Sequence, residues 1–291
     1  MFAKERIIKS LLIAVAMIIP MSFIIILFHV TYESIPAITQ IGTGLFDAEG
    51  AWRPLSATPS FSILPMILAT LYIAFLSVLM AAPVACLCAI FLNYCIDKKI
   101  AKPALAFIDL LAGVPSVIFG FLGLIIVISN FERIFNMSAG ESILAASVVL
   151  AVMVLPFIVS SYSESIEKAK EKYGVAALSL GTSTEYSVIK IIIPTTKRGA
   201  FASIVTAFAR AMSETMAVMM VIGNAPIFPR LFGRAQTIPA LTALEFGNAE
   251  YGSLHLSAIY AANLTLIVLI ACVLIGSHLL RKGLLKDDDN V

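Results

Sequence analysis

Charged side chains are scarce in this chain: they make up 13% of its 291 residues, whereas hydrophobic residues make up 60%. An ordinary soluble domain carries about 25% charged residues, so that class of protein is excluded. The mean hydropathy of +0.98 agrees with this exclusion. The composition therefore predicts an all-α protein that crosses a membrane several times.

Cysteine and histidine are also rare, and neither occurs in a pattern typical of a metal site. The four cysteines lie in or at the end of apolar runs, where small packing residues are common, and their spacing predicts neither disulfides nor zinc. The three histidines lie near the ends of such runs. The net charge of +2 comes from scattered basic residues, so no nucleic-acid surface is expected either.

A third absence concerns nucleotides. The chain has no Gly-x-x-x-x-Gly-Lys-Ser/Thr loop, which holds phosphates in many ATPases, and no polar segment long enough for an ATP-binding domain. We therefore expect no enzymatic activity in this chain and no cofactor bound by it.

Six apolar stretches are long enough to cross a hydrocarbon core of about 30 Å as helices. They are Ile7–His29, Ile63–Ile96, Ala104–Ser129, Ile143–Tyr162, Ala200–Gly223 and Leu254–Leu280. The first follows several basic residues, as the core of a signal peptide does. Its apolar part exceeds the roughly 7–15 residues of such a core and no small-residue cleavage site follows, so it is expected to remain as a span.

Basic residues are distributed unequally between the loops that join these stretches. Of the 20 lysines and arginines, the loops on one side contain only Arg53, Arg133, Arg230 and Arg234. Since positive charge stays on the cytoplasmic side, both termini are predicted to be cytoplasmic, and the fifth stretch runs outward. The external loops near 30–62 and 224–253 either meet a partner or simply cap the helices.

Two charges lie inside the fifth stretch, where a bilayer makes them costly. Arg210 falls near the midplane, and Glu214 follows it by one helical turn. Each costs roughly 2.5–3.5 kcal/mol on insertion scales, so both are candidate functional residues. Helical spacing places Thr206 and Ser213 on the same small, polar face, which predicts a substrate pathway. The alternative is a structural pair that neutralises itself through i, i+4 geometry.

The third stretch contains a weaker signal for the same pathway. Gly113 and Pro115 interrupt a helix, and the Ser116 hydroxyl can bond a carbonyl that the proline leaves free. Pro115 and Ser116 are therefore candidate pore-lining residues. A kink that serves only packing is the alternative.

The cytoplasmic loop at 164–197 has an unusual composition, because a charged segment is followed by small apolar residues and then by a glycine. These residues are Val175, Ala176, Ala177, Leu180 and Gly181. A glycine can stop a helix, and the next four residues have the Ser/Thr-x-x-Glu spacing of a capping box. The pattern predicts helix, bend and helix, with the second helix ending about Pro194. An alanine face suits insertion into a cleft of another protein.

This loop resembles the coupling loop of ATP-binding-cassette importer permeases. The family motif Glu-Ala-Ala-x-x-x-Gly-x9-Ile-x-Leu-Pro is matched at Ala176, Ala177, Gly181 and Pro194. Val175 stands where glutamate is usual, and an isoleucine replaces the leucine. The resemblance implies a type I importer permease fold with six transmembrane helices, in which this loop contacts an ATPase.

Other segments are similar to the phosphate-specific members of that family. They are Phe61–Pro65, Gly113–Gly120 and Arg210–Val218. The Met-Ala-Val after Thr215 and the later Ile222–Asn224 resemble the C-type rather than the A-type permease subunit. The residue before Glu214 is serine instead of the usual glycine.

The resemblance implies a domain division and an assembly. The domains are an N-terminal span with an external loop at 1–62, a permease core at 63–281 and a cytoplasmic tail at 282–291. The implied partners in the plasma or inner membrane are an A-type permease subunit, which completes a heterodimer, and two copies of an ATP-binding subunit. That subunit holds ATP and Mg, and an external phosphate-binding protein delivers the substrate.

The function implied by the resemblance is ATP-driven import of inorganic phosphate by alternating access. Because arginine offers forked donors that match phosphate oxygens, Arg210 is the expected partner of the anion. Glu214 is expected to hold Arg210 in the resting state and to release it when the anion arrives. Three alternatives remain. They are import of another oxyanion, such as molybdate or sulfate, a proton-coupled secondary transporter in which both charges act as a relay, and a non-transporting membrane scaffold or sensor, which gives no reason for charge at the midplane.

Overall fold

The computed structural model describes residues 2–136 and 138–288, and most of them are helical. Within this described part, five helical stretches are long and apolar enough to cross a membrane. They are Leu11–Gln40, Leu64–Tyr94, Ser116–Phe135, Ile143–Gly174 and Leu254–Leu280. The prediction of an all-α, multi-pass membrane protein is confirmed.

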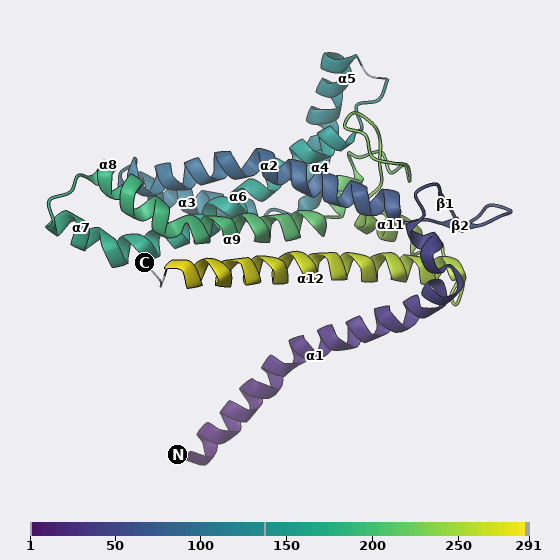
Figure 1. Cartoon of the computed structure of the whole chain (residues 1–291), viewed down its shortest axis with the longest axis horizontal. Coiled ribbons are helices and arrows are strands. Elements are labelled where there is room, and N and C mark those ends of the chain that lie inside the picture. The colour runs from purple at the N-terminus through teal and green to yellow at the C-terminus, as the bar shows by residue number, and fades with distance from the viewer. Residues whose placement is uncertain (1, 137, 289–291) are drawn as a thin grey trace. The chain divides into compact units, whose positions relative to one another are not determined.

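Most of the described elements are labelled in Figure 1. The α-helices are α1 (Phe2–Gln40), α2 (Leu64–Tyr94), α3 (Lys98–Ala112), α4 (Ser116–Leu122), α5 (Ser129–Phe135), α6 (Ile143–Ala169), α7 (Val175–Ser179), α8 (Thr184–Ser187), α9 (Ile193–Met212), α10 (Met216–Met219), α11 (Ile238–Glu245) and α12 (Leu254–Asp288). A 3₁₀ turn, η1 (Gly42–Phe46), and the π-helical turns η2 (Gly123–Ile128), η3 (Lys170–Gly174) and η4 (Val188–Ile192) join some of them. The strands are β1 (Trp52–Arg53) and β2 (Ser60–Phe61).

The chain forms two compact units. One combines Met1–Leu64 with Leu244–Val268, and the other combines Pro65–Ala243 with Leu269–Val291. The division expected from the sequence separates consecutive segments by their expected role, whereas these units are defined by contacts, and the expected division stays a prediction. Residues 289–291 of the expected tail lie outside the described residues.

In the first unit, a buried tryptophan ties the two-stranded hairpin to the start of α12. β1 and β2 pair in antiparallel fashion, with Trp52 opposite Phe61. Trp52 is only 4% exposed, and its indole N–H donates to Glu245 Oε2 over 2.8 Å. His255 Nε2 lies 2.8 Å from the same carboxylate oxygen. The segment around Trp52, which the sequence predicts to be external, is therefore packed against α11 and α12.

In the second unit, α6 packs against α3, α4, α9 and α10, and its contact with α9 is the most extensive (Figure 1). The facing side chains are small or hydroxylated, which lets the two backbones approach closely. Ser203 Oγ donates to Ser161 Oγ over 2.9 Å, and the hydroxyls of Tyr162 and Thr196 lie 3.2 Å apart. Gly199 lies directly against Ser165. The two helices therefore form one tightly joined pair.

The segment after α10 folds back into the core of this unit. The backbone N–H groups of Ser142, Ile143 and Leu144, at the start of α6, donate to carbonyls of the loop at 221–233. These donors have no partner inside α6, so the loop satisfies them. Residues 235–241 are all buried. The middle of the loop expected at 224–253 is therefore buried, whereas residues before it, such as Ile227 and Phe232, and residues after it are exposed.

Gly199 allows a direct test of the α6–α9 packing. A Cβ atom at this position would lie 2.6 Å from Ser165 Cβ, so Gly199→Ala forces the helices apart. Overpacking of this kind costs about 1–3 kcal/mol. We expect the Tm of the purified protein to fall by roughly 2–6 °C.

The matched control is Gly276→Ala in α12, because no atom lies within 4 Å of the added Cβ there. Alanine favours a helix over glycine, so this variant should keep or slightly raise the Tm. Equal Tm values for the two variants would show that the close approach at Gly199 is not a stabilising feature.

Candidate functional site

The candidate site is centred on the place where α9 stops. The helix ends at Met212, three non-helical residues follow, and α10 begins at Met216. Ser213 uses both its backbone N–H (3.1 Å) and its hydroxyl (2.9 Å) to donate to the Arg210 carbonyl. The Glu214 N–H donates to the Ala211 carbonyl over 3.3 Å. Two of the last carbonyls of α9 are thus satisfied locally, as a helix end in an apolar setting requires.

This break corrects the prediction of one unbroken span at Ala200–Gly223. The physical reason lies in the run Ser213, Glu214 and Thr215, whose polar groups offer the backbone hydrogen bonds that compete with the helix. Since Glu214 lies beyond the helix end, the i, i+4 geometry expected between it and Arg210 is lost. Within the described residues, no ion pair joins the two, so the self-neutralising pair is absent.

Each of the two charges has another partner. The Arg210 guanidinium lies over the ring of Phe157 on α6, with 3.7 Å between its central carbon and the ring centroid. Glu214 Oε1 instead accepts from the backbone N–H of Ala217 over 3.4 Å. Sequence reasoning missed Phe157, because α6 is apolar around most of its circumference and one more aromatic residue gives no signal there.

The expected interruption in the third apolar stretch is confirmed. α3 ends at Ala112, and Pro115 directly precedes α4. α4 packs against α10, where a Cβ on Gly120 would lie 3.0 Å from Ala217 Cα. The two broken stretches are therefore neighbours. Whether Pro115 and Ser116 line the pathway stays a prediction.

Thr206 occupies the same face of α9 as Arg210, one turn earlier. Its hydroxyl donates to the Ala202 carbonyl over 2.9 Å. It lines a small cavity of about 180 Å³ together with Phe201, Ser277 and His278. A polar cavity thus lies one turn from the candidate site.

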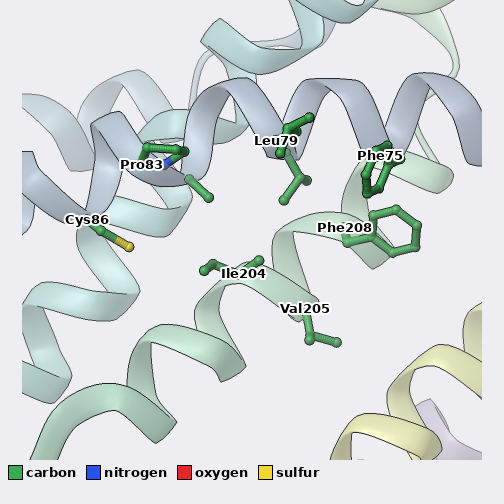
Figure 2. Close-up of a pocket in the computed structure, with 9 residues that line it drawn as sticks. Phe75, Leu79, Pro83, Cys86, Ile204, Val205 and Phe208 are labelled. Carbon is green, nitrogen blue, oxygen red and sulfur yellow. The ribbon is translucent and has the colours of Figure 1, made fainter. Parts of the chain in front are cut away.

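A larger groove of about 540 Å³ lies between α2 and α9, and it is lined almost entirely by apolar atoms. Figure 2 shows Phe75, Leu79 and Pro83 of α2 opposite Ile204, Val205 and Phe208 of α9. None of the predicted pathway residues lines it. Because such a surface offers an anion no hydrogen-bond donor, this groove does not hold a charged substrate.

The predicted coupling loop forms a helical hairpin. α6 continues through η3 into α7, and Gly181 turns the chain with a φ of +74°, which favours glycine. Ser183, rather than Thr182, caps α8 by accepting from the Tyr186 N–H over 3.2 Å. Ala177 is buried within the chain, whereas Ala176 and Leu180 are exposed, Leu180 at 82%. The side chain of Val175 lies outside the described residues.

The second helix of this loop does not end at Pro194, which corrects that prediction. α8, η4 and α9 follow one another without a break, and Pro194 occupies the first turn of α9. The first turn of a helix needs no N–H from the proline, and the wider π-helical turn at Val188–Ile192 directly precedes it. A helical segment of roughly 40 Å thus connects Thr184 to the end of α9 beside Arg210.

A lysine attaches the start of this loop to α2. Lys170 Nζ donates to the Asn93 carbonyl over 2.8 Å and lies 4.4 Å from the ring centroid of Tyr94. Both contacts are at the last residues of α2, where the carbonyl groups lack helical partners. Sequence reasoning missed this contact, since Lys170 is one of several charges in a solvated segment.

Comparison with known proteins agrees with this geometry. Residues 85–286 match the family described as binding-protein-dependent transport system inner membrane component. A probable ABC transporter permease protein, YqgH of Bacillus subtilis, is 31% identical over 75% of this chain and 71% of its own length. A phosphate transport system permease protein, PstC of Mesorhizobium japonicum, is 31% identical over 84% of this chain and 80% of its own. The probable PstC of Methanocaldococcus jannaschii is 29% identical over 89% and 88%.

Among solved structures, an inward-facing MetNI methionine ABC transporter superposes with a TM-score of 0.59. The match covers 76% of this chain and 95% of that one at 14% identity, so it shows the fold alone. The importer permease fold expected from the coupling loop is thus confirmed. The chain belongs to the family of binding-protein-dependent transport system inner membrane components.

Proposed function

We propose that this chain is the C-type permease subunit of an ATP-driven importer of inorganic phosphate. The observation that carries the proposal is the broken end of α9, where Arg210 is exposed and has neither a hydrogen bond nor an ion pair from its side chain within the described residues. A charge left without a counter-ion in an apolar chain is suited to a mobile anion. The relatives named as phosphate transport permeases support the choice of phosphate.

Arginine suits this anion for a physical reason. Its guanidinium stays charged and offers donors in a fork that matches two oxygens of a phosphate. Glu214 is not the resting partner of Arg210 in this conformation, since it accepts from α10 instead. We place Glu214 and Ser213 at the break, where they form the wall of the path, with Thr206 one turn further toward the start of α9.

The assembly follows from the same proposal. An A-type permease completes a heterodimer, and two ATP-binding subunits hold ATP and Mg against coupling loops such as the hairpin at Ala176–Gly181. An external binding protein delivers phosphate, and both termini are cytoplasmic in the cell membrane. The continuous helical segment from Thr184 to Met212 supports transmission of motion from the ATPase to the site.

Uptake by the assembled complex in proteoliposomes tests this function against the two alternatives that are transporters. We expect ATP-dependent uptake of labelled phosphate that continues in a tenfold excess of sulfate or molybdate. This outcome requires the complex to prefer phosphate by more than about 1.4 kcal/mol of binding free energy. Preferred uptake of sulfate or molybdate would identify a different oxyanion permease. Uptake that persists with an ATPase that cannot hydrolyse ATP would instead indicate a secondary transporter.

Lys170 provides a test of coupling through the loop. Lys170→Met removes the hydrogen bond to Asn93 and the contact with Tyr94, so the loop can move independently of α2. We expect the ratio of phosphate imported to ATP hydrolysed to fall at least about threefold, because a hydrogen bond from a charged donor is lost. The measurement is simultaneous uptake and ATP hydrolysis in proteoliposomes.

Lys168→Met is the matched control on the same helix. Lys168 is exposed and, within the described residues, pairs with Glu164 one turn away, and such surface pairs contribute little. This variant should keep the wild-type ratio. A Lys170→Met complex that also keeps it would remove the attachment to α2 from the coupling mechanism.

A further inference from the structure

The contact between Arg210 and Phe157 places the guanidinium charge over an aromatic ring. Its central carbon lies 3.7 Å from the ring centroid, which is the ordinary distance for carbon atoms in contact. A nitrogen aimed straight at the centroid would lie about 1.3 Å nearer, at about 2.4 Å, well inside van der Waals contact. None of the guanidinium nitrogens therefore points directly at the ring centre.

A ring under the charge leaves the forked donors to another group, because the ring attracts the guanidinium through its π-electrons and offers no carboxylate or carbonyl oxygen. Within the described residues, the Arg210 side chain makes no hydrogen bond and no ion pair, and the residue is exposed. The charge is thus held at the ring while its fork stays free.

Phe157 is itself held in place. It follows the buried Pro156 on α6, and α6 is joined to α9 by the contacts at Ser161–Ser203 and Tyr162–Thr196. The ring and the guanidinium are therefore carried by two helices that these contacts hold together.

We propose that Phe157 is a positioning residue for anion transfer. Its ring holds the Arg210 guanidinium in place, so that two of its donors meet two oxygens of a tetrahedral oxyanion, and it does so without the strong neutralisation that a carboxylate would impose. The proposal rests on the proposed function, and it assigns to an aromatic face the role that the sequence assigned to Glu214.

Kinetics of uptake by the full complex test this role. Phe157→Leu removes the ring face and keeps an apolar side chain, and it should lower the maximal rate of phosphate uptake about tenfold. The half-saturating concentration should stay within about twofold, because the external binding protein captures the anion first. Phe157→Tyr, which keeps the ring face, should restore most of the rate.

A double-mutant cycle separates positioning from a general loss of packing. In an Arg210→Lys background there is no planar fork to orient, so Phe157→Leu should change the remaining rate by less than about twofold. Phe75→Leu, an aromatic change in the apolar groove of α2, is the matched control and should show no dependence on Arg210. If Phe157→Leu does not assemble, Phe157→Met replaces it in the same cycle.

The outcomes distinguish this inference from the proposed function. A wild-type complex that imports phosphate, together with equal losses from Phe157→Leu in both backgrounds, or a Phe157→Leu rate equal to the wild type, would overturn the role of Phe157. A wild-type complex that imports another oxyanion would overturn the proposed substrate only, and the same cycle is then measured with that oxyanion.

Discussion

The end of α9 depends on one constraint: backbone carbonyls in an apolar surrounding need hydrogen-bond donors. An unbroken helix would satisfy them internally, but α9 stops at Met212, and Ser213 and Glu214 supply the missing donors from the chain itself. Non-helical backbone at membrane depth is tolerated where it is buried in protein or lines a polar cavity. The break therefore lies beside the exposed Arg210, at the place where we propose that the anion passes.

A rigid surrounding makes this break useful. The contact of Gly199 with Ser165, and the hydroxyl pairs that join α6 to α9, fix the two helices as one body. At one end of this body lies the coupling hairpin, and near the other lies Arg210 over Phe157. Because Pro194 lies in a first helical turn after a π-helical turn, no flexible joint separates the hairpin from α9. Movement of the hairpin is thus expected to reach the arginine.

The sequence predicted the features that depend on composition and local pattern. Apolar length indicated the five long stretches of the described residues, together with a sixth at Ala200–Gly223 that the structure breaks. Gly113 and Pro115 indicated the break before α4, and the alanine and glycine residues indicated the helical hairpin. The sequence-based prediction failed where helical and non-helical conformations have similar free energies. The sequence pattern predicted that the helix continues through Ser213–Thr215, because apolar residues surround this segment. In the structure, the polar side chains of the segment end the helix. The sequence predicted a helix end at Pro194 because proline usually ends a helix, whereas proline is tolerated in the first turn of a helix.

Contacts between distant segments could not be predicted at all. Phe157 and Lys170 are unremarkable in their own helices, and their partners lie far away in the chain. Glu214 was paired with Arg210 on the basis of helical spacing, which holds only where the helix continues. The charge itself was informative from the sequence, but its partner was a property of the tertiary structure.

Accessibility of the break tests its role most directly. With Cys86, Cys88, Cys95 and Cys272 replaced by alanine, a cysteine introduced as Ser213→Cys would line the path, whereas one introduced as Val152→Cys lies on an exposed apolar face of α6. In the assembled complex, an anionic, water-soluble thiol reagent should modify the Ser213→Cys protein and leave the Val152→Cys protein unmodified, and phosphate should slow the reaction. Equal resistance of both cysteines, with uptake intact, would contradict a polar path at the end of α9.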